Sequence, residues 1–203
     1  MARGATARLF VAADPPAAVC EALAEWARET TAEWAAGSPR RSRRAPRVLK
    51  ADALHLTLCF LGSRPLGEIP ELSLALGACA EHVGELALGA PLWLPPRRPR
   101  ALAVEIHDRD GSLTALQARL SRALSRASAW EPERRRFRPH ITLVRMGMGV
   151  APRGGAAGER PLLAATPQRS FVPGSIVLYR SLTTPAGAIY EPLERCELVG
   201  GEG

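Results

Sequence analysis

The chain is poor in cysteine, and its four cysteines, Cys20, Cys59, Cys79 and Cys196, stand far apart. No Cys-x-x-Cys pair occurs that would begin a metal site or a redox motif. The pattern therefore argues against a cysteine-based metal centre. It indicates reduced thiols in a cytoplasmic protein.

Long apolar runs are also missing from the beginning of the chain. The apolar stretch that follows Arg8 is short and ends at Asp14. A secretory signal or a membrane span needs a longer stretch. We therefore expect a protein of the cytoplasm that does not contact membranes.

Lysine is almost absent, because Lys50 is the only lysine among 27 basic residues. Arginine therefore carries nearly all of the formal net charge of +7, and its planar guanidinium binds phosphate through paired hydrogen bonds. The charge indicates a phosphate-bearing partner such as a nucleic acid, with coding bias as the competing explanation. With 203 residues and 46% apolar content, the chain can bury a core as one large domain or two joined lobes.

Two short segments carry the same arrangement of one histidine and one threonine. Residues 54–62 read LHLTLCFLG, and residues 139–143 read PHITL. A chain with four histidines and nine threonines is expected to contain about 0.2 His-x-Thr tripeptides by chance. Both segments alternate polar and apolar residues, which predicts strands that present the histidine and threonine of each motif on one face. The repeated motif is the strongest functional signal in the chain.

Strand and helix patterns alternate along the rest of the sequence. Apolar or alternating runs predict strands at 8–13, 86–94, 101–106, 175–179 and 188–198. Helical spacing of apolar residues predicts helices at 17–36 (with Asp14 as a candidate N-cap), at 70–81 and from Ser112 onward. Because each half contains one His-x-Thr strand, we expect an internal duplication: two α+β lobes facing each other across a cleft. The expected unit is a single bilobal domain over residues 1–203.

The motifs resemble those of the two-histidine (2H) phosphoesterases. Within that superfamily, the chain is similar to the RNA 2′,3′-cyclic phosphodiesterases, also called 2′-5′ RNA ligases. The resemblance covers nearly the whole chain: the opening strand RLFVA, both His-x-Thr segments, the link RRPR at residues 97–100 and the closing strands with VLY and YE. It implies a pseudo-symmetric bilobal α+β fold, with two antiparallel sheets flanking a central cleft and helices on the outside. It also implies hydrolysis without a metal or another cofactor.

The resemblance also implies roles for single residues. His55 and His140 match the catalytic histidines of the family, and Thr57 and Thr142 match its phosphate-binding threonines. Further candidates for substrate binding lie in the matching segments: Arg145, Arg138 and Phe10.

Two positions are unusual for the family pattern. Many members carry a basic residue where this chain has Cys59, and strand alternation would place Cys59 on the face of His55 and Thr57. The same alternation would point Arg145 away from His140. Because Cys59 replaces a basic residue, we expect one phosphate or RNA contact to be missing at this position.

The motif residues suit the opening of a 2′,3′-cyclic phosphate. A water molecule has to lose a proton on one side of phosphorus, and the leaving ribose oxygen has to gain one on the other side. Histidine, with an ordinary pKa of about 6.5, performs either role near neutral pH, and the threonine hydroxyls donate to the non-bridging oxygens. Our hypothesis from the sequence makes His140 the base and His55 the acid. No residue pattern supplies further ligands for zinc beside these two histidines, and His82 and His107 are expected to be ordinary packed or exposed residues.

The leading functional hypothesis is metal-independent hydrolysis of RNA 2′,3′-cyclic phosphate ends to 2′-phosphomonoesters, with reversible 2′-5′ ligation as a weaker activity. We expect a monomer, and tRNA fragments are candidate substrates. Two alternatives stay open. One is a phosphodiesterase for a small cyclic phosphate, such as ADP-ribose cyclic phosphate or a cyclic nucleotide. The other is an RNA-binding module without turnover.

Overall fold

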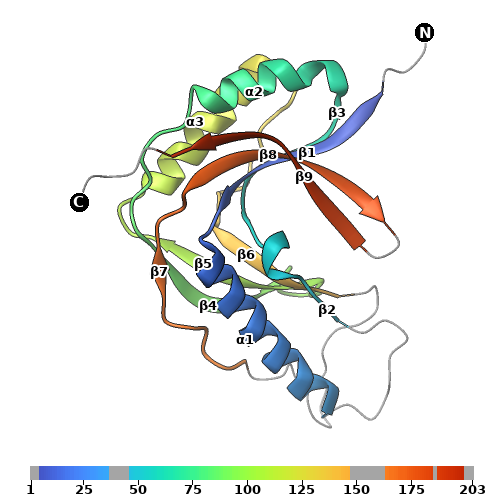
Figure 1. The fold of residues 1–203 in the computed structure, drawn as a ribbon, viewed down its shortest axis with the longest axis vertical. Helices are drawn as coiled ribbons and strands as arrows, with labels where there is room; N and C mark the ends of the chain where they lie inside the picture. Colours follow the sequence, from blue (N-terminus) through green and yellow to red (C-terminus); the bar gives the residue numbers. More distant parts are fainter. Residues whose placement is uncertain (1–4, 37–45, 147–162, 185–186, 199–203) are drawn as a thin grey trace.

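The secondary structure comes from a computed structural model that describes residues 5–36, 46–146, 163–184 and 187–198 (Figure 1). The strands are β1 (Thr6–Asp14), β2 (Arg47–Val48), β3 (Leu56–Pro65), β4 (Leu86–Leu94), β5 (Ala101–Asp108), β6 (His140–Arg145), β7 (Ser170–Phe171), β8 (Ser175–Thr184) and β9 (Gly187–Glu197). The helices are α1 (Ala17–Ala36), α2 (Ile69–Gly77) and α3 (Ser112–Ala127), with short 3-10 turns η1 (Ala51–Ala53) and η2 (Leu66–Glu68). The predicted strands and helices are all present, whereas the short strands β2 and β7 were not predicted.

Within the described ranges, nine strands form one sheet in the order β7-β4-β5-β6-β3-β1-β8-β9, with β2 paired to β6. Every pairing is antiparallel, which confirms the predicted α+β class with antiparallel strands. We call β3, β1, β8 and β9 the first half-sheet, and β6, β5, β4, β7 and β2 the second half-sheet. One residue pair of the described chain, Leu56 with Ile141, joins the two half-sheets. The two sheets expected from the sequence are therefore continuous at this point.

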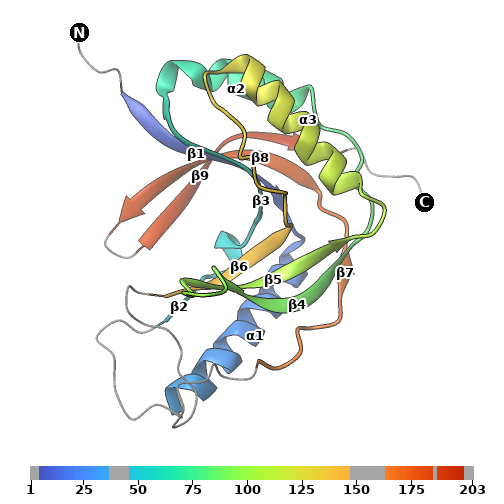
Figure 2. The ribbon, with the colours of Figure 1, turned by 180° about the vertical axis from the view of Figure 1, so that it is seen from behind.

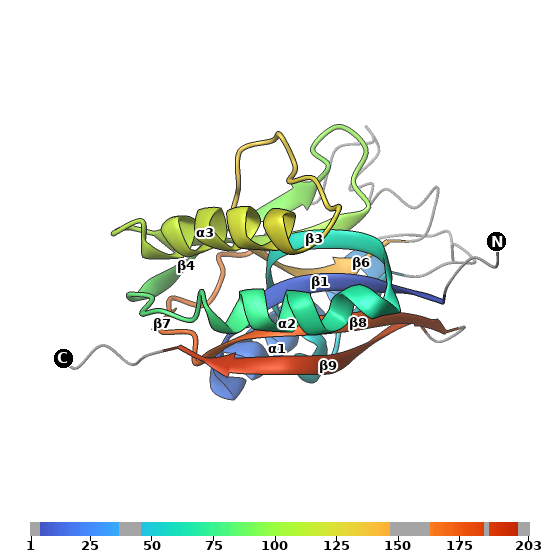
Figure 3. The same cartoon turned by 90° about the horizontal axis from the view of Figure 1, so that it is seen from above.

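Two of the helices pack across the junction between the half-sheets. Helix α1 follows β1 of the first half-sheet but packs against β2 and β6 of the second. Helix α3 follows β5 of the second half-sheet and packs against both β5 and β3. Helix α2 lies beside α3 and against β8 and β9 (Figures 2 and 3). None of the described helices is long and apolar enough to cross a membrane.

The long helices bury the apolar stripes that their sequences predict. In α1 the buried stripe consists of Val19, Leu23, Trp26 and Thr30. In α3 it consists of Leu113, Leu116, Leu120 and Leu124, and all four side chains are 0% exposed. Apart from the polar Thr30, the residues of both stripes belong to the apolar core. The same core contains Leu56 and Ile141. The packing of these helices therefore fixes the strands that carry the two His-x-Thr motifs.

Two local predictions differ from the structure. Helix α2 ends at Gly77 rather than near residue 81, and the helix propensity of glycine is lower than that of every residue except proline. Asp14, expected to cap α1, belongs to β1. Its carboxylate accepts a hydrogen bond from the Tyr179 hydroxyl at 2.9–3.0 Å and pairs with Arg195 at 2.9 Å. The first turn of α1 instead donates its backbone N–H groups to the carbonyl of Pro16.

Candidate functional site

The two His-x-Thr motifs meet where the half-sheets join. Their central residues, Leu56 and Ile141, are partners in the β3–β6 pairing, and both are fully buried in the core. Because neighbouring side chains of a strand point to opposite faces, the motif histidines and threonines project away from that core. The antiparallel register places each histidine next to the threonine of the other motif. The structure thus brings together four predicted site residues: His55, Thr57, His140 and Thr142.

Both histidines are held by the same local hydrogen bond. The Nδ1 atom of His55 lies 2.9 Å from the carbonyl oxygen of Ala53, and Nδ1 of His140 lies 2.8 Å from that of Arg138. A carbonyl oxygen only accepts, so Nδ1 carries the proton in each ring. In the neutral state, Nε2 of each ring is therefore the unprotonated nitrogen, ready to accept a proton.

Three aromatic rings form a wall around His55. The ring centroids of Phe10 and Tyr190 lie 4.8 and 4.9 Å from that of His55, and Tyr179 lies 6.2 Å away. Phe10 also stacks on Tyr179 and meets Tyr190 edge-on, both at 5.2 Å. Both tyrosines of the chain thus belong to this wall. The wall fixes the imidazole and removes much of its hydration.

The protonated form of His55 is disfavoured by its surroundings. Burial lowers the pKa of His55 from 6.5 to about 4, and the nearby charges of Arg145 and His140 lower it further, while the hydrogen bond to Ala53 acts in the opposite direction. The His55 imidazole is therefore neutral at pH 7.

A β-bulge in β3 corrects the expectation for Cys59. Consecutive residues of β1 pair with Cys59 and Thr57, so Leu58 is skipped and the alternation is shifted by one residue. Cys59 is buried and its Sγ contacts Ser121 Oγ of α3 at 3.6 Å, on the core side. Burial also raises the pKa of its thiol to about 11. Phe60, not Cys59, shares the face of Thr57. The side chain of Cys59 is therefore not in a position to contact a ligand, and no ligand contact is lost there.

A matching bulge in β6 corrects the expectation for Arg145. Leu102 and Ala103 of β5 pair with Val144 and Thr142, so Leu143 is skipped. Leu143 and Val144 are both buried, whereas Arg145 is exposed and returns to the face of Thr142. Arg145 and Phe60 each lie five residues after their motif histidine and occupy equivalent positions in the two half-sheets.

Small residues flank both threonines. Ala12 of β1 is the partner of Thr57, and Ala103 of β5 is the partner of Thr142. Within the described ranges, neither threonine hydroxyl has a hydrogen-bond partner. Both hydroxyls are therefore available to a ligand.

The other two predicted substrate-binding residues have different surroundings. The Arg138 side chain is 62% exposed and lies 3.5 Å from Glu105, and the Arg138 carbonyl holds His140. Phe10 is only 3% exposed, so its ring supports His55 more than it offers a surface. His82 and His107 are both exposed, as expected.

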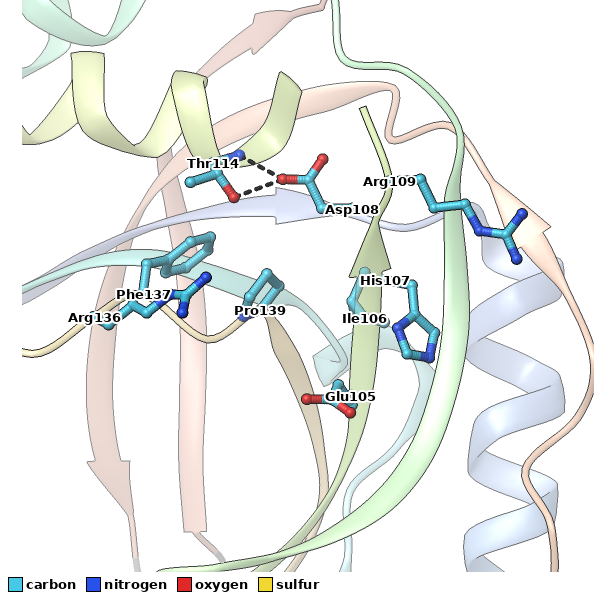
Figure 4. A pocket seen from close by; sticks show the side chains of 9 residues that line it. All are labelled: Glu105, Ile106, His107, Asp108, Arg109, Thr114, Arg136, Phe137 and Pro139. Carbon is cyan, nitrogen blue, oxygen red and sulfur yellow. Dashed lines mark hydrogen bonds between the residues drawn. The ribbon is translucent and has the colours of Figure 1, made fainter. Parts of the chain in front are cut away.

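A cavity of about 440 Å³ lies beside β5 and the segment that leads into β6 (Figure 4). In it, the Asp108 carboxylate accepts hydrogen bonds from the backbone N–H and the hydroxyl of Thr114. Its lining consists of Glu105, Ile106, His107, Asp108, Arg109, Thr114, Arg136, Phe137 and Pro139. None of the four motif residues lines this cavity.

Sequence reasoning missed three residues of the site: Phe60, Tyr179 and Tyr190. The tyrosines had a usable signal, because the chain contains only two and both lie in closing strands. Phe60 had no such signal, because its position depends on the bulge at Leu58.

Comparisons with known proteins show similarity in sequence and in fold, although no protein-family model matches the chain. Over 139 residues, the chain is 34% identical to an Escherichia coli (strain K12) protein named RNA 2′,3′-cyclic phosphodiesterase, and the match covers 68% of this chain and 71% of that protein. The fold is similar to that of a Thermus thermophilus protein, with a TM-score of 0.73, 26% identity and coverage of 96% and 100%. It is also similar to Escherichia coli LigT complexed with 3′-AMP, with a TM-score of 0.70, 28% identity and coverage of 96% and 99%.

Proposed function

The chain belongs to the 2H phosphoesterases and, within them, to the RNA 2′,3′-cyclic phosphodiesterase family, and from this premise we propose that it opens the 2′,3′-cyclic phosphate at RNA ends to a 2′-phosphomonoester. One observation carries the proposal. The pairing of Leu56 with Ile141 gathers two imidazoles and two threonine hydroxyls on one face of the sheet. In-line attack on a cyclic phosphate needs a base, an acid and donors to the phosphate oxygens, which these groups supply.

In our proposal His55 is the base, which reverses the assignment favoured by the sequence. With a pKa of about 4, only about one His55 ring in a thousand carries a second proton at pH 7, which suits a proton acceptor and not a donor. Its Nδ1–H is held by Ala53, so Nε2 removes the proton from the attacking water. The aromatic wall keeps the ring in one orientation during this step.

His140 is then the acid in hydrolysis. Its protonated Nε2 donates to the ribose O3′ as the bond between phosphorus and O3′ breaks, and the phosphate stays on O2′. The hydrogen bond to the Arg138 carbonyl orients the ring for this transfer. When the 5′-hydroxyl of a second RNA takes the place of water, His55 removes its proton and His140 again protonates O3′ as the bond to phosphorus breaks, so the same pair would support weak 2′-5′ ligation.

Thr57, Thr142 and Arg145 bind the non-bridging phosphate oxygens in this proposal. Hydroxyl and guanidinium donors stabilise the negative charge that grows on these oxygens in the transition state. The bulge at Leu143 supports the role of Arg145, because it returns the side chain to the motif face. The two histidines and these donors complete the reaction without a metal or another cofactor.

RNA with a cyclic phosphate terminus, tRNA fragments included, is the proposed substrate. The net charge of +7 and the fold shared with LigT in complex with 3′-AMP support a nucleotide ligand. We also propose that the protein acts as a monomer in the cytoplasm, where its four unpaired cysteines stay reduced.

The test is a hydrolysis assay with chelator present. Adenosine 2′,3′-cyclic phosphate and a short RNA with a cyclic phosphate end are incubated with the protein, and the 2′- and 3′-phosphate products are separated by chromatography. We expect 2′-phosphate, and a loss of at least about a hundredfold in kcat/KM for both His55→Ala and His140→Ala.

His107→Ala is the matched control, since it removes an exposed histidine outside the motifs. Equal losses in all three variants would point to a general effect on the fold. Undiminished activity in His55→Ala would contradict the acid–base assignment. A weaker reaction with the RNA than with the mononucleotide would contradict RNA as the substrate.

A further inference from the structure

The cavity beside β5 begins one strand away from His140. Strand β6 lies between β3 and β5, and its His140 is the direct partner of Glu105 in the β5–β6 pairing. Direct partners in an antiparallel pair have side chains on the same face of the sheet. Glu105, which lines the cavity, therefore belongs to the catalytic face, on the side of His140 that is remote from β3 and Thr57.

The chemistry of the proposed reaction directs the RNA chain towards this cavity. In that reaction His140 protonates O3′, so O3′ lies at His140 when its bond to phosphorus breaks. In the ribose, C3′ is bonded to C4′, which carries C5′ and the phosphodiester to the preceding nucleotide, whereas the base is attached beyond C2′. The 5′ part of the RNA therefore leaves the catalytic groups on the His140 side. The cavity lies on that side.

Arg136 is the cation of the cavity lining that can bind this phosphodiester. Within the part of the chain that the structure describes, no ion pair joins Arg136 to an acidic side chain. Both carboxylates of the lining have partners: Glu105 lies 3.5 Å from Arg138, and Asp108 accepts hydrogen bonds from Thr114. The charge of Arg136 is therefore available to a phosphate, which a guanidinium binds through paired hydrogen bonds.

An aromatic ring stands beside this cation. Figure 4 shows the Phe137 ring next to the Arg136 side chain, whereas Arg109 and His107 extend to the other side of β5. Phe137 is half-buried and packs against the apolar core, which holds its ring in place. His107 lies over Gly89 of β4. The cavity, at about 440 Å³, has the size of a small-ligand site and offers a ligand one cation and one aromatic ring.

We propose that this cavity binds the penultimate nucleotide of the RNA, which precedes the nucleotide with the cyclic phosphate. Arg136 binds the phosphodiester between the two nucleotides, and the penultimate base packs against the Phe137 ring. Stacking on an aromatic ring is tolerant of sequence, because every base has a π-face. The proposal rests on the proposed function, because the position of O3′ at His140 sets the direction of the chain. It extends the recognised substrate from a nucleotide to an oligonucleotide.

The experiment compares substrates that reach the cavity with one that does not. Values of kcat/KM are measured for adenosine 2′,3′-cyclic phosphate, for its 5′-phosphorylated form and for the dinucleotide ApA with a 2′,3′-cyclic phosphate end. The proteins are the wild type, Arg136→Gln, Phe137→Leu and the matched control Arg135→Gln. Arg135→Gln removes the same charge from a neighbouring exposed residue that does not line the cavity.

We expect the wild-type protein to prefer both 5′-extended substrates to the mononucleotide. Arg136→Gln should lower the ratio of kcat/KM for each extended substrate to that for the mononucleotide by about tenfold, because a charge-assisted hydrogen bond to phosphate is lost. Phe137→Leu should lower the ratio for the dinucleotide alone, by about fivefold or more, and Arg135→Gln should preserve both ratios. An equal loss with all three substrates in Arg136→Gln, or equal ratios in Arg136→Gln and Arg135→Gln, would overturn the proposal.

If the wild-type protein hydrolyses none of the three substrates, the proposed function fails and binding tests the cavity. In calorimetric titrations, ApA with a terminal 2′-phosphate should then bind more weakly to Arg136→Gln than to Arg135→Gln, and adenosine 2′-monophosphate should bind equally to both. Equal affinities for the dinucleotide would refute the cavity site independently of catalysis.

Discussion

The low pKa of His55 predicts a specific loss of stability in acid. The perturbation is a decrease in pH from 7.5 to 5, applied to the wild-type protein and to His55→Gln, whose side chain does not titrate. In the folded protein His55 binds a second proton only near pH 4, and in the unfolded chain it does so near 6.5. Between these values the unfolded state binds more protons, so the free energy of unfolding decreases as the pH falls.

The magnitude follows from the difference between the two pKa values. One pKa unit corresponds to about 1.4 kcal/mol, so titration of His55 removes about 2 kcal/mol of stability by pH 5 and about 3 kcal/mol by pH 4. The cause is the aromatic wall, which deprives the imidazolium of hydration, together with the charge of Arg145. Above pH 7 the contribution is absent, because His55 is neutral in both states.

Urea unfolding followed by circular dichroism measures this effect. Between pH 7.5 and 5, we expect the wild-type protein to lose about 2 kcal/mol more stability than His55→Gln. His107→Gln, at an exposed position, should follow the wild-type curve. Parallel curves for wild-type and His55→Gln would refute the burial argument and, with it, the assignment of His55 as the base.

Three further predictions concern residues around the motifs. Arg145→Gln should lower kcat/KM by about tenfold to a hundredfold, and it should raise the pKa of His55 because a nearby positive charge is removed. NMR titration of the His55 imidazole measures this pKa. An unchanged titration curve would mean that Arg145 lies too far from His55 to influence it. Cys59→Lys should lower the free energy of unfolding in urea by about 3 kcal/mol, because it buries a charge beneath α3. A smaller loss of stability in Cys59→Lys than in Cys59→Ser would contradict the buried position of Cys59. Ala103→Val should crowd Thr142, the strand partner of Ala103, and lower kcat/KM by about tenfold or more, while Ala103→Gly stays close to wild type. Equal activities of the two variants would mean that the position of Thr142 does not matter for the reaction.

Local patterns predicted the elements whose structure depends on nearby residues. The apolar stripe of α1 predicted the span from Ala17 to Ala36, because a helix buries residues three or four positions apart. The two His-x-Thr segments predicted that their polar residues share a face, because two residues separated by one do so on any strand. The family resemblance added the antiparallel arrangement of the strands. The prediction of one bilobal domain over residues 1–203 remains a prediction.

Features that depend on partners distant in the sequence could not be predicted in this way. The bulges at Leu58 and Leu143 arise from the register of β1 with β3 and of β5 with β6, and each shifts the alternation after the motif. The faces of Cys59 and Arg145 were wrong for this reason. Asp14 was assigned to a helix cap because its sequence neighbours suggested one, whereas its partners, Tyr179 and Arg195, come from the other end of the chain.

The packing of α1 and α3 across the junction of the half-sheets has a consequence for how the chain folds. Because α1 is connected to the first half-sheet and covers the second, while α3 is connected to the second and also covers the first, each half leaves apolar surface bare until the other has formed. We therefore expect the two half-sheets to fold as one cooperative unit, so that both His-x-Thr motifs become ordered together.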